Sequence, residues 1–126
     1  MIGTLTPVYE PWDVLKIPFP YHARPALEYR PVLVVAGGRL ESAHGLLWVL
    51  MITSAGNASW PGDVPITDLR SAGLPAPSAV RCAKIATIAT SEAQKIGVLM
   101  RPAERAAIAR NIAGAVASAT GRQTND

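Results

Sequence analysis

The chain has 126 residues, 49% of them hydrophobic, with a net charge of +3 and a pI of about 9.4, so it is long enough to bury one core. Cys82 is its only cysteine, which excludes an intrachain disulfide and a four-cysteine zinc site. No basic segment followed by an apolar run opens the sequence, and its longest apolar stretch, residues 45–52, is too short to cross a bilayer. We therefore expect a cytoplasmic protein with no membrane segment.

Short β-strands separated by turns are predicted for the first three quarters of the chain. Eleven prolines and ten glycines favour short elements. Apolar and β-branched runs predict strands at residues 12–19, 30–36, 45–53, 63–66, 79–88 and 95–99. Pro18 and Pro20 are expected to end the first strand, and residues 21–29 to form a loop. Thr67 is expected to cap a single helical turn that ends at Gly73.

One helix is predicted at residues 102–119, because Ile108, Ile112 and Val116 recur every four residues on one face. That face is expected to pack against the sheet or against a second subunit, and we interpret Trp12 and Trp48 as core residues. The pattern favours one mainly β domain with α, over residues 1–126: a small barrel or half-open sheet with a C-terminal helix. Its core is expected at about residues 10–119, and residues 120–126 form a polar tail.

Basic residues gather in the second half of the sequence, where they predict attraction to phosphates or to acidic partners. A solvated basic face without a partner is the alternative. Between residues 70 and 110, the acidic residues are Glu92 and Glu104, and the basic residues are Arg70, Arg81, Lys84, Lys95, Arg101, Arg105 and Arg110.

Most familiar catalytic motifs are absent from the sequence, including the phosphate-binding G-x-x-x-x-G-K-[ST] and the zinc-binding H-E-x-x-H. His22 and His44 lie far apart in the chain, and acidic residues do not cluster as a Mg²⁺ site requires. Arginines and hydroxyls remain. They suit RNA cleavage, because RNA supplies its own nucleophile, the 2′-hydroxyl, and arginine matches the charge and shape of a phosphate.

Six segments in order resemble the MazF/PemK family of toxin ribonucleases, over roughly residues 10–117. They are W-D-V-L-K-I-P-F-P at 12–20, R-P-V-L-V-V at 30–35, L-M-I-T-S at 50–54, G-L-P-A-P-S-A-V-R at 73–81, K-I-A-T-I at 84–88 and K-I-G-V-L at 95–99. The resemblance implies an SH3-like barrel with a terminal helix, and a homodimer. It implies cleavage of single-stranded mRNA at a short sequence, without a metal or other cofactor, leaving a 2′,3′-cyclic phosphate. A cognate antitoxin would block the RNA groove.

The family's catalytic arginine falls on Arg30 and its catalytic threonine on Thr53. The alternative for Arg30 is a strand-edge arginine held by a carboxylate such as Glu28, and for Thr53 ordinary strand filler. The chain departs from many relatives at Ala86, where they carry a second arginine. Arg81 or Lys84 is a candidate to supply that cation and contact RNA phosphates, although a solvated face explains both equally well.

Four further residues are RNA-site candidates, each with a plainer interpretation. Ser54 adjoins Thr53 and is placed to bond a phosphate, or to form a turn. Trp60 is a candidate to stack on an RNA base, or to lie in a core or dimer interface. Arg24 is a candidate to follow the RNA backbone, and His22 to act as an acid or base, although a lone loop histidine is usually idle.

Two other functions stay open at this point. The same barrel serves as a non-catalytic toxin that inhibits a protein target, as the related gyrase inhibitors do, and such a binder needs neither Arg30 nor Thr53. Alternatively, the chain is a decayed toxin that binds only its antitoxin, a possibility that Ala86 keeps alive.

Overall fold

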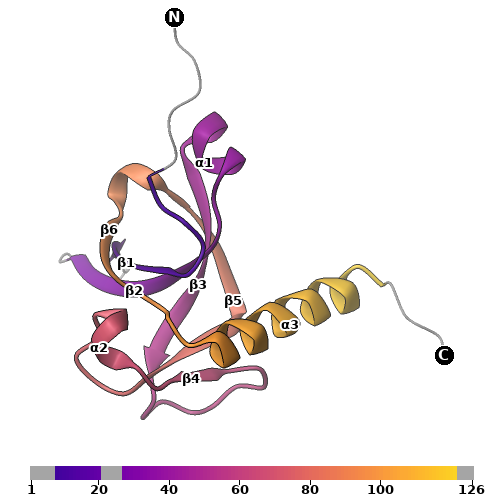
Figure 1. The fold of residues 1–126 in the computed structure, drawn as a ribbon. Helices are drawn as coiled ribbons and strands as arrows, with labels where there is room; N and C mark the ends of the chain where they lie inside the picture. The colour runs from indigo at the N-terminus through magenta and orange to yellow at the C-terminus, as the bar shows by residue number, and fades with distance from the viewer. Residues whose placement is uncertain (1–7, 21–26, 122–126) are drawn as a thin grey trace, which may run out of the picture.

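A computed structural model describes residues 8–20 and 27–121 of the chain. Six antiparallel strands form one sheet in the order β4-β5-β3-β2-β1-β6, which coils into a half-barrel (Figure 1). The strands are β1 (Asp13–Pro20), β2 (Leu27–Ala36), β3 (Leu46–Ser54), β4 (Val64–Ile66), β5 (Ser78–Ala89) and β6 (Gln94–Val98). The helices are α1 (Arg39–His44), α2 (Leu69–Ala72) and α3 (Pro102–Ala119), with a 3₁₀ turn η1 (Thr90–Glu92). This architecture confirms the predicted mainly β fold with a C-terminal helix.

The coiled sheet buries both faces of its central strands. Successive residues of β1, β2 and β3 enter two different apolar clusters, because neighbouring side chains of a strand point to opposite faces. The first core includes Val14, Leu33, Leu50 and Ile52, together with residues of β4, β5, α2 and α3. The second core consists of Leu15, Ile17, Val32, Val34, Leu47, Val49 and Met51. Double burial explains why these strands read as continuous apolar runs.

The first strand continues through both prolines that were expected to end it. Pro18 lies opposite Tyr29 and Pro20 opposite Leu27, so β2 begins inside the segment predicted as a loop. Strand β6 pairs with β1 only along Asp13–Lys16. The prolines therefore lie where β1 has a neighbour on one side only, and an edge position tolerates the missing N–H group.

Two further local predictions are wrong, and one helix was not predicted. Asp68, rather than Thr67, caps α2, since its carboxylate accepts the Ser71 N–H at 3.1 Å. Trp48 is not a core residue: it is 47% exposed on β3, whereas Trp12 packs against the first core. Helix α1 was missed. It is held by buried Glu41, whose carboxylate accepts the N–H groups of Val8 and Tyr9 at 3.0 and 3.2 Å.

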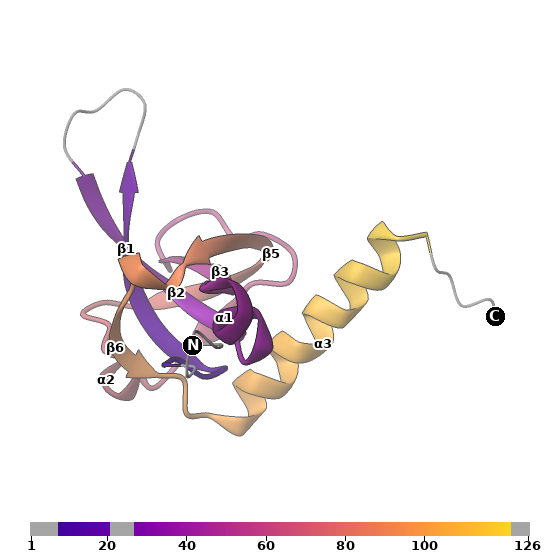
Figure 2. The ribbon, with the colours of Figure 1, turned by 90° about the horizontal axis from the view of Figure 1, so that it is seen from above.

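Helix α3 has the predicted bounds, but only its first half packs on the sheet. Ile108 is fully buried and Ile112 is half-buried, whereas Val116 is exposed. Viewed from above, the C-terminal half of α3 runs away from the barrel (Figure 2). No helix among the described residues is long and apolar enough to cross a membrane.

Helix α2 connects the two edge regions of the half-barrel. It follows β4 in the chain and contacts β6, the strand at the opposite edge of the sheet. Gly97 of β6 makes this approach possible, because a Cβ atom there would collide with the backbone of Ala72 and Ser71. A glycine in a strand often marks such a close backbone contact.

We expect Gly97→Ala to lower the free energy of unfolding by about 2 kcal/mol or more, because the backbone of α2 must move to admit the methyl group. Gly114→Ala is the matched control: it lies within α3 with open space around its Cα, and should raise stability by about 0.5–1 kcal/mol. Urea unfolding followed by circular dichroism measures both. Equal effects of the two substitutions would contradict the tight α2–β6 contact.

Candidate functional site

A groove of about 320 Å³ opens where the central strands end. It contains both residues that the sequence singled out for catalysis, Arg30 and Thr53. Its walls come from the start of β2, the end of β3, the turn after β3 and the segment before β5. The lining residues are Arg30, Pro31, Ile52, Thr53, Ser54, Asn57, Leu74, Pro75, Ala76, Pro77 and Ser78.

Strand register brings Arg30 and Thr53 together. Val32 of β2 lies opposite Met51 of β3. Both residues belong to the second core, and Arg30 and Thr53 lie two residues beyond them on their strands. Because side chains of a strand alternate between its two faces, Arg30 and Thr53 continue the face of the second core. Thr53 is paired with Ala79 of β5.

Arg30 lies beside the acidic residue anticipated for it. Its Nη2 donates to Glu28 Oε1 at 3.4 Å, and each side chain is more than one third exposed. An exposed ion pair of this kind contributes about 0–1 kcal/mol. This contact therefore does not decide between the structural and the catalytic interpretation of Arg30.

Asn57 holds the Thr53 hydroxyl, a contact that the sequence analysis missed. The Asn57 Nδ2 group donates to Thr53 Oγ1 at 2.7 Å. Ser54 shapes the turn between them: its Oγ accepts the Gly56 N–H at 3.2 Å, and its carbonyl accepts the Asn57 N–H at 3.0 Å. Turn chemistry was evident in the sequence S-A-G-N, but no local signal shows that the amide folds back onto the preceding strand.

A smaller pocket of about 120 Å³ adjoins the groove and shares Thr53, Ser54 and Asn57 with it. Asp63 and Arg81 line its far side as a buried ion pair, with side chains 8% and 10% exposed. Arg81 Nε and Nη2 donate to the two carboxylate oxygens of Asp63 at 3.2 and 3.0 Å, and Nη2 also donates to the Ala58 carbonyl at 2.6 Å. Hydrogen bonding from Arg81 holds the pKa of the Asp63 carboxyl below its usual value.

Trp60 lies against this ion pair at the surface. The Arg81 guanidinium carbon is 4.0 Å from the centre of the Trp60 ring, and the backbone N–H of Trp60 donates to Asp63 Oδ2 at 2.9 Å. Trp60 itself is 43% exposed. The structure thus joins two predicted site residues, Trp60 and Arg81, in one stack rather than placing both separately along the groove.

Other candidates lie elsewhere. Lys84 is exposed on β5 and does not line the groove. Ala86 lies opposite Val49 and lines a different, apolar groove with Trp48. His22 and Arg24 are outside the described residues. No three His, Cys, Asp or Glu side chains in the described ranges gather as metal ligands.

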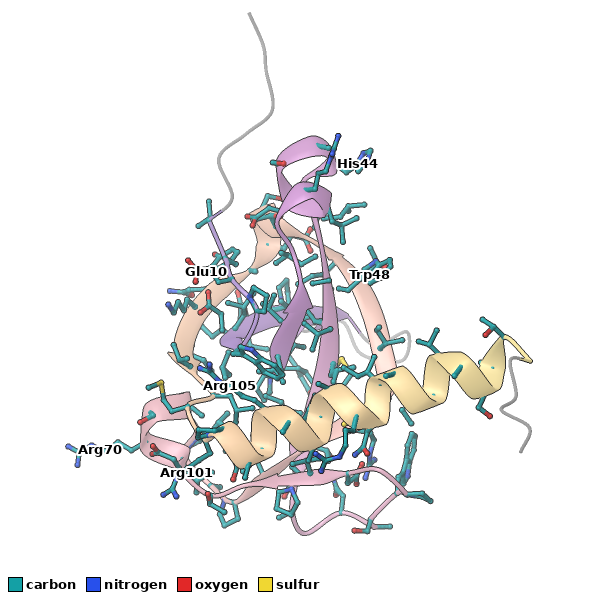
Figure 3. All side chains as sticks on the ribbon, turned by 45° about the vertical axis from the view of Figure 1, so that its right-hand side comes forward. Glu10, His44, Trp48, Arg70, Arg101 and Arg105 are labelled. Carbon is teal, nitrogen blue, oxygen red and sulfur yellow. The ribbon has the colours of Figure 1, made fainter. Side chains whose placement is uncertain are left out.

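The basic residues predicted to form a positive face are dispersed. Arg70 and Arg101 project into solvent near α2 and the start of α3, and Arg105 points toward the barrel (Figure 3). There Arg105 donates to the Leu99 carbonyl at 2.7 Å and lies over the Trp12 ring. Lys95 pairs with Asp13 at 3.3 Å. Among these basic residues, Arg81 comes nearest to the groove, and it is engaged with Asp63.

The chain is thus a half-barrel of antiparallel strands with one C-terminal helix, and an arginine and a threonine share a groove at the ends of two central strands. The family described as PemK-like, MazF-like toxin of type II toxin–antitoxin system matches residues 10–115. The chain belongs to this family.

Solved structures agree with that assignment. MazF in a MazE–MazF complex from Deinococcus radiodurans is 15% identical, with a TM-score of 0.67 over 86% of this chain and 95% of that one. Mycobacterium tuberculosis toxin MazF-mt6 is 27% identical, with a TM-score of 0.56 over 71% and 87%. A mycobacterial endoribonuclease in complex with its cognate antitoxin is 16% identical, with a TM-score of 0.62 over 94% and 100%. No curated protein matches the sequence.

We expect Asp63→Asn to lower the free energy of unfolding by about 3 kcal/mol at pH 7, because it leaves the buried Arg81 without its counter-charge. The folded-state pKa of Asp63 is lowered, so its stabilisation is complete above the unfolded pKa of about 3.9 and is lost as the pH falls below that value. The difference between the two proteins should therefore shrink on acidification. Urea unfolding at several pH values measures it.

Asp68→Asn is the control for that experiment. Asp68 is an exposed helix cap whose pKa is lowered by hydrogen bonds from Ser71. Asparagine also caps helices well, so the loss should be much smaller. A pH-independent difference between the wild type and Asp63→Asn would contradict the role assigned to the ion pair.

Proposed function

We propose that this toxin is a metal-independent endoribonuclease that cuts single-stranded RNA. The observation that supports this activity is the shared groove of Arg30 and Thr53, which is open to solvent. One guanidinium and one hydroxyl suffice for the chemistry when the substrate carries the nucleophile. The endoribonuclease activity named for the mycobacterial relative supports the same reaction class.

The proposed reaction is a transesterification followed by strand release. The RNA 2′-oxygen forms a bond to the adjacent phosphorus and gives its proton to a solvent water. The bond from phosphorus to the 5′-oxygen breaks, and that oxygen takes a proton from solvent water. Arg30 stabilises the charge on the phosphorane oxygens, and Thr53 holds the phosphate so that the 2′-hydroxyl is in line. The products are a 2′,3′-cyclic phosphate and a 5′-hydroxyl end.

Residues around the groove complete the proposed RNA path. Ser54 bonds a neighbouring phosphate, and Trp60 offers the ring face away from Arg81 to an RNA base. Arg81 contributes by fixing that ring, while Lys84 attracts more distant phosphates. His22 and Arg24 stay predictions for the segment outside the described residues. Dependence on the 2′-hydroxyl would restrict cleavage to RNA.

An antitoxin is the second proposed partner. The Deinococcus radiodurans relative occurs in a complex of MazE and MazF, and the mycobacterial relative is bound to its cognate antitoxin. We infer that a cognate antitoxin of this chain covers the Arg30–Thr53 groove. Such cover would exclude RNA and silence the toxin.

We expect Arg30→Ala to lower RNA cleavage about 10²–10³-fold or more, because it removes the cation that meets the transition-state charge. Purified protein is incubated with a mixed RNA in EDTA, and product ends are mapped. Arg39→Ala, an exposed arginine on α1, is the control and should cleave normally. Full activity of Arg30→Ala would refute the assignment, and intact RNA with the wild-type protein would favour inhibition of a protein target.

A homodimer is the third proposal. Trp48, Ile85 and Val116 are exposed and line an apolar groove of about 370 Å³ between the sheet and the projecting half of α3. Figure 3 shows Trp48 on the side of the sheet toward which α3 runs. Among the described residues, none that lines this groove is charged. Because a two-fold interface packs one patch against its own copy, an apolar groove beside an apolar helix is self-complementary.

We expect Val116→Glu to shift the protein from dimer to monomer, because it introduces a charge into the apolar contact. Ala109→Glu, on the exposed part of α3 that overlies the barrel, is the matched control. Light scattering coupled to size-exclusion chromatography gives the mass of each variant. A wild-type monomer at micromolar concentration would contradict the proposal.

A further inference from the structure

We propose that Asn57 is a positioning residue for Thr53: its amide orients the threonine hydroxyl so that the hydroxyl proton points into the groove toward the RNA phosphate. This inference rests on the proposed ribonuclease function and assigns a new residue to it. Asn57 is the amide side chain that lines both the main groove and the adjoining pocket, and its Nδ2 group is 2.7 Å from Thr53 Oγ1.

The chemistry follows from the donors and acceptors of a hydroxyl. A threonine hydroxyl has one proton to donate and two lone pairs that accept. Once the Asn57 amide occupies a lone pair, the Thr53 proton must point away from that amide. Accepting a hydrogen bond also polarises the hydroxyl, which makes it a stronger donor to its next partner. The groove side, where Arg30 lies, is the direction in which a phosphate oxygen can accept that proton.

The loop around Asn57 is held at several points, although its residues are exposed. Arg81 binds the Ala58 carbonyl, and the Trp60 N–H binds Asp63. From α3, the Asn111 Nδ2 group donates to the Gly62 carbonyl at 3.0 Å. These anchors follow Asn57 directly in the chain and limit its movement. The buried Asp63–Arg81 pair and helix α3 thus hold the loop that carries Asn57. Without these anchors, water would replace Thr53 as the partner of the Asn57 amide.

A plain alternative is that Asn57 only closes the turn, as loop asparagines commonly do. Its backbone N–H does bond the Ser54 carbonyl. That bond belongs to the backbone and survives substitution of the side chain. The two roles therefore differ in one measurable respect: a positioning residue acts only when the Thr53 hydroxyl is present.

A double-mutant cycle separates these roles. Asn57→Ala should lower the single-turnover cleavage rate about tenfold, the effect of losing one hydrogen bond in the transition state. Thr53→Val removes the hydroxyl and keeps the shape. In the Thr53→Val background, Asn57→Ala should change the residual rate less than twofold. Equal effects in both backgrounds would overturn the proposal.

Asn57→Asp provides a sharper arm of the same test. A carboxylate cannot donate to Oγ1, so it draws the Thr53 proton toward itself and away from the groove. Cleavage should fall further than in Asn57→Ala. Gln94→Glu, an exposed amide-to-acid change on β6, controls for the added charge and should cleave normally. An Asn57→Asp protein as active as the wild type would refute the inference.

A binding measurement distinguishes failure of this inference from failure of the proposed function. The same cycle is repeated on the Kd for an RNA whose 2′-hydroxyls are methylated, which cannot be cut. If the wild type binds the methylated RNA but does not cut the unmethylated RNA, the ribonuclease proposal fails and the positioning inference is still tested by binding. Loss of affinity on Asn57→Ala only when Thr53 is present then supports the inference, and equal loss in both backgrounds overturns it. A wild-type protein that neither binds nor cuts RNA refutes both.

Discussion

Burial of both faces of the central strands is the constraint on which the site depends. Over residues 32–34 of β2 and 49–52 of β3, apolar side chains alternate between two cores, so a polar side chain there would be buried on either face. Polar groups first become possible where the strands leave the cores. A register slip of one residue would exchange the two cores, so the pairing of Val32 with Met51 is strongly specified. The antiparallel direction then brings the start of β2 and the end of β3, with Arg30 and Thr53, to one edge.

The loop after β3 shows how a surface site is kept rigid without an apolar core of its own. Residues 54–62 are exposed, so hydrophobic burial does little to order them. Order comes instead from the buried Asp63–Arg81 pair, whose extra hydrogen bonds reach back to Ala58 and Trp60. A buried ion pair contributes little net stability compared with apolar residues, but it specifies one geometry. Specificity of that kind suits a loop that presents side chains to a ligand.

Charge is used locally in this protein rather than as one broad field. Arg81 and Lys95 pair with aspartates, and Arg105 binds a backbone carbonyl next to Trp12. Each contact stabilises a particular junction of the fold. The net charge of +3 still gives a weak attraction to polyanions. In the proposed function, recognition of a phosphate depends on the few groups that line the groove, above all Arg30.

Strand and helix content was predictable from the sequence, because periodicity and apolar runs report local burial directly. The run at 30–36, the run at 45–53 and the four-residue repeat along α3 each predicted the observed element. Arg30 and Thr53 were singled out by the resemblance of their segments to the MazF/PemK family. Prediction from local sequence failed where contacts with residues distant in the chain determine the local structure. The prolines of β1 are tolerated because β6 stops short, and α1 is held by buried Glu41.

The sequence by itself therefore determined the class of fold and the order of its main elements, because these depend on patterns within single segments, and its family resemblance pointed to Arg30 and Thr53 in the groove. Only the tertiary structure decided that Arg81 pairs with Asp63 and stacks on Trp60, that Trp48 faces outward, and that Asn57 bonds Thr53. Such contacts join residues of loops and strands at sequence separations that the periodicity of a helix or strand does not predict. They follow from how the coiled sheet places its ends, which is a property of the whole chain.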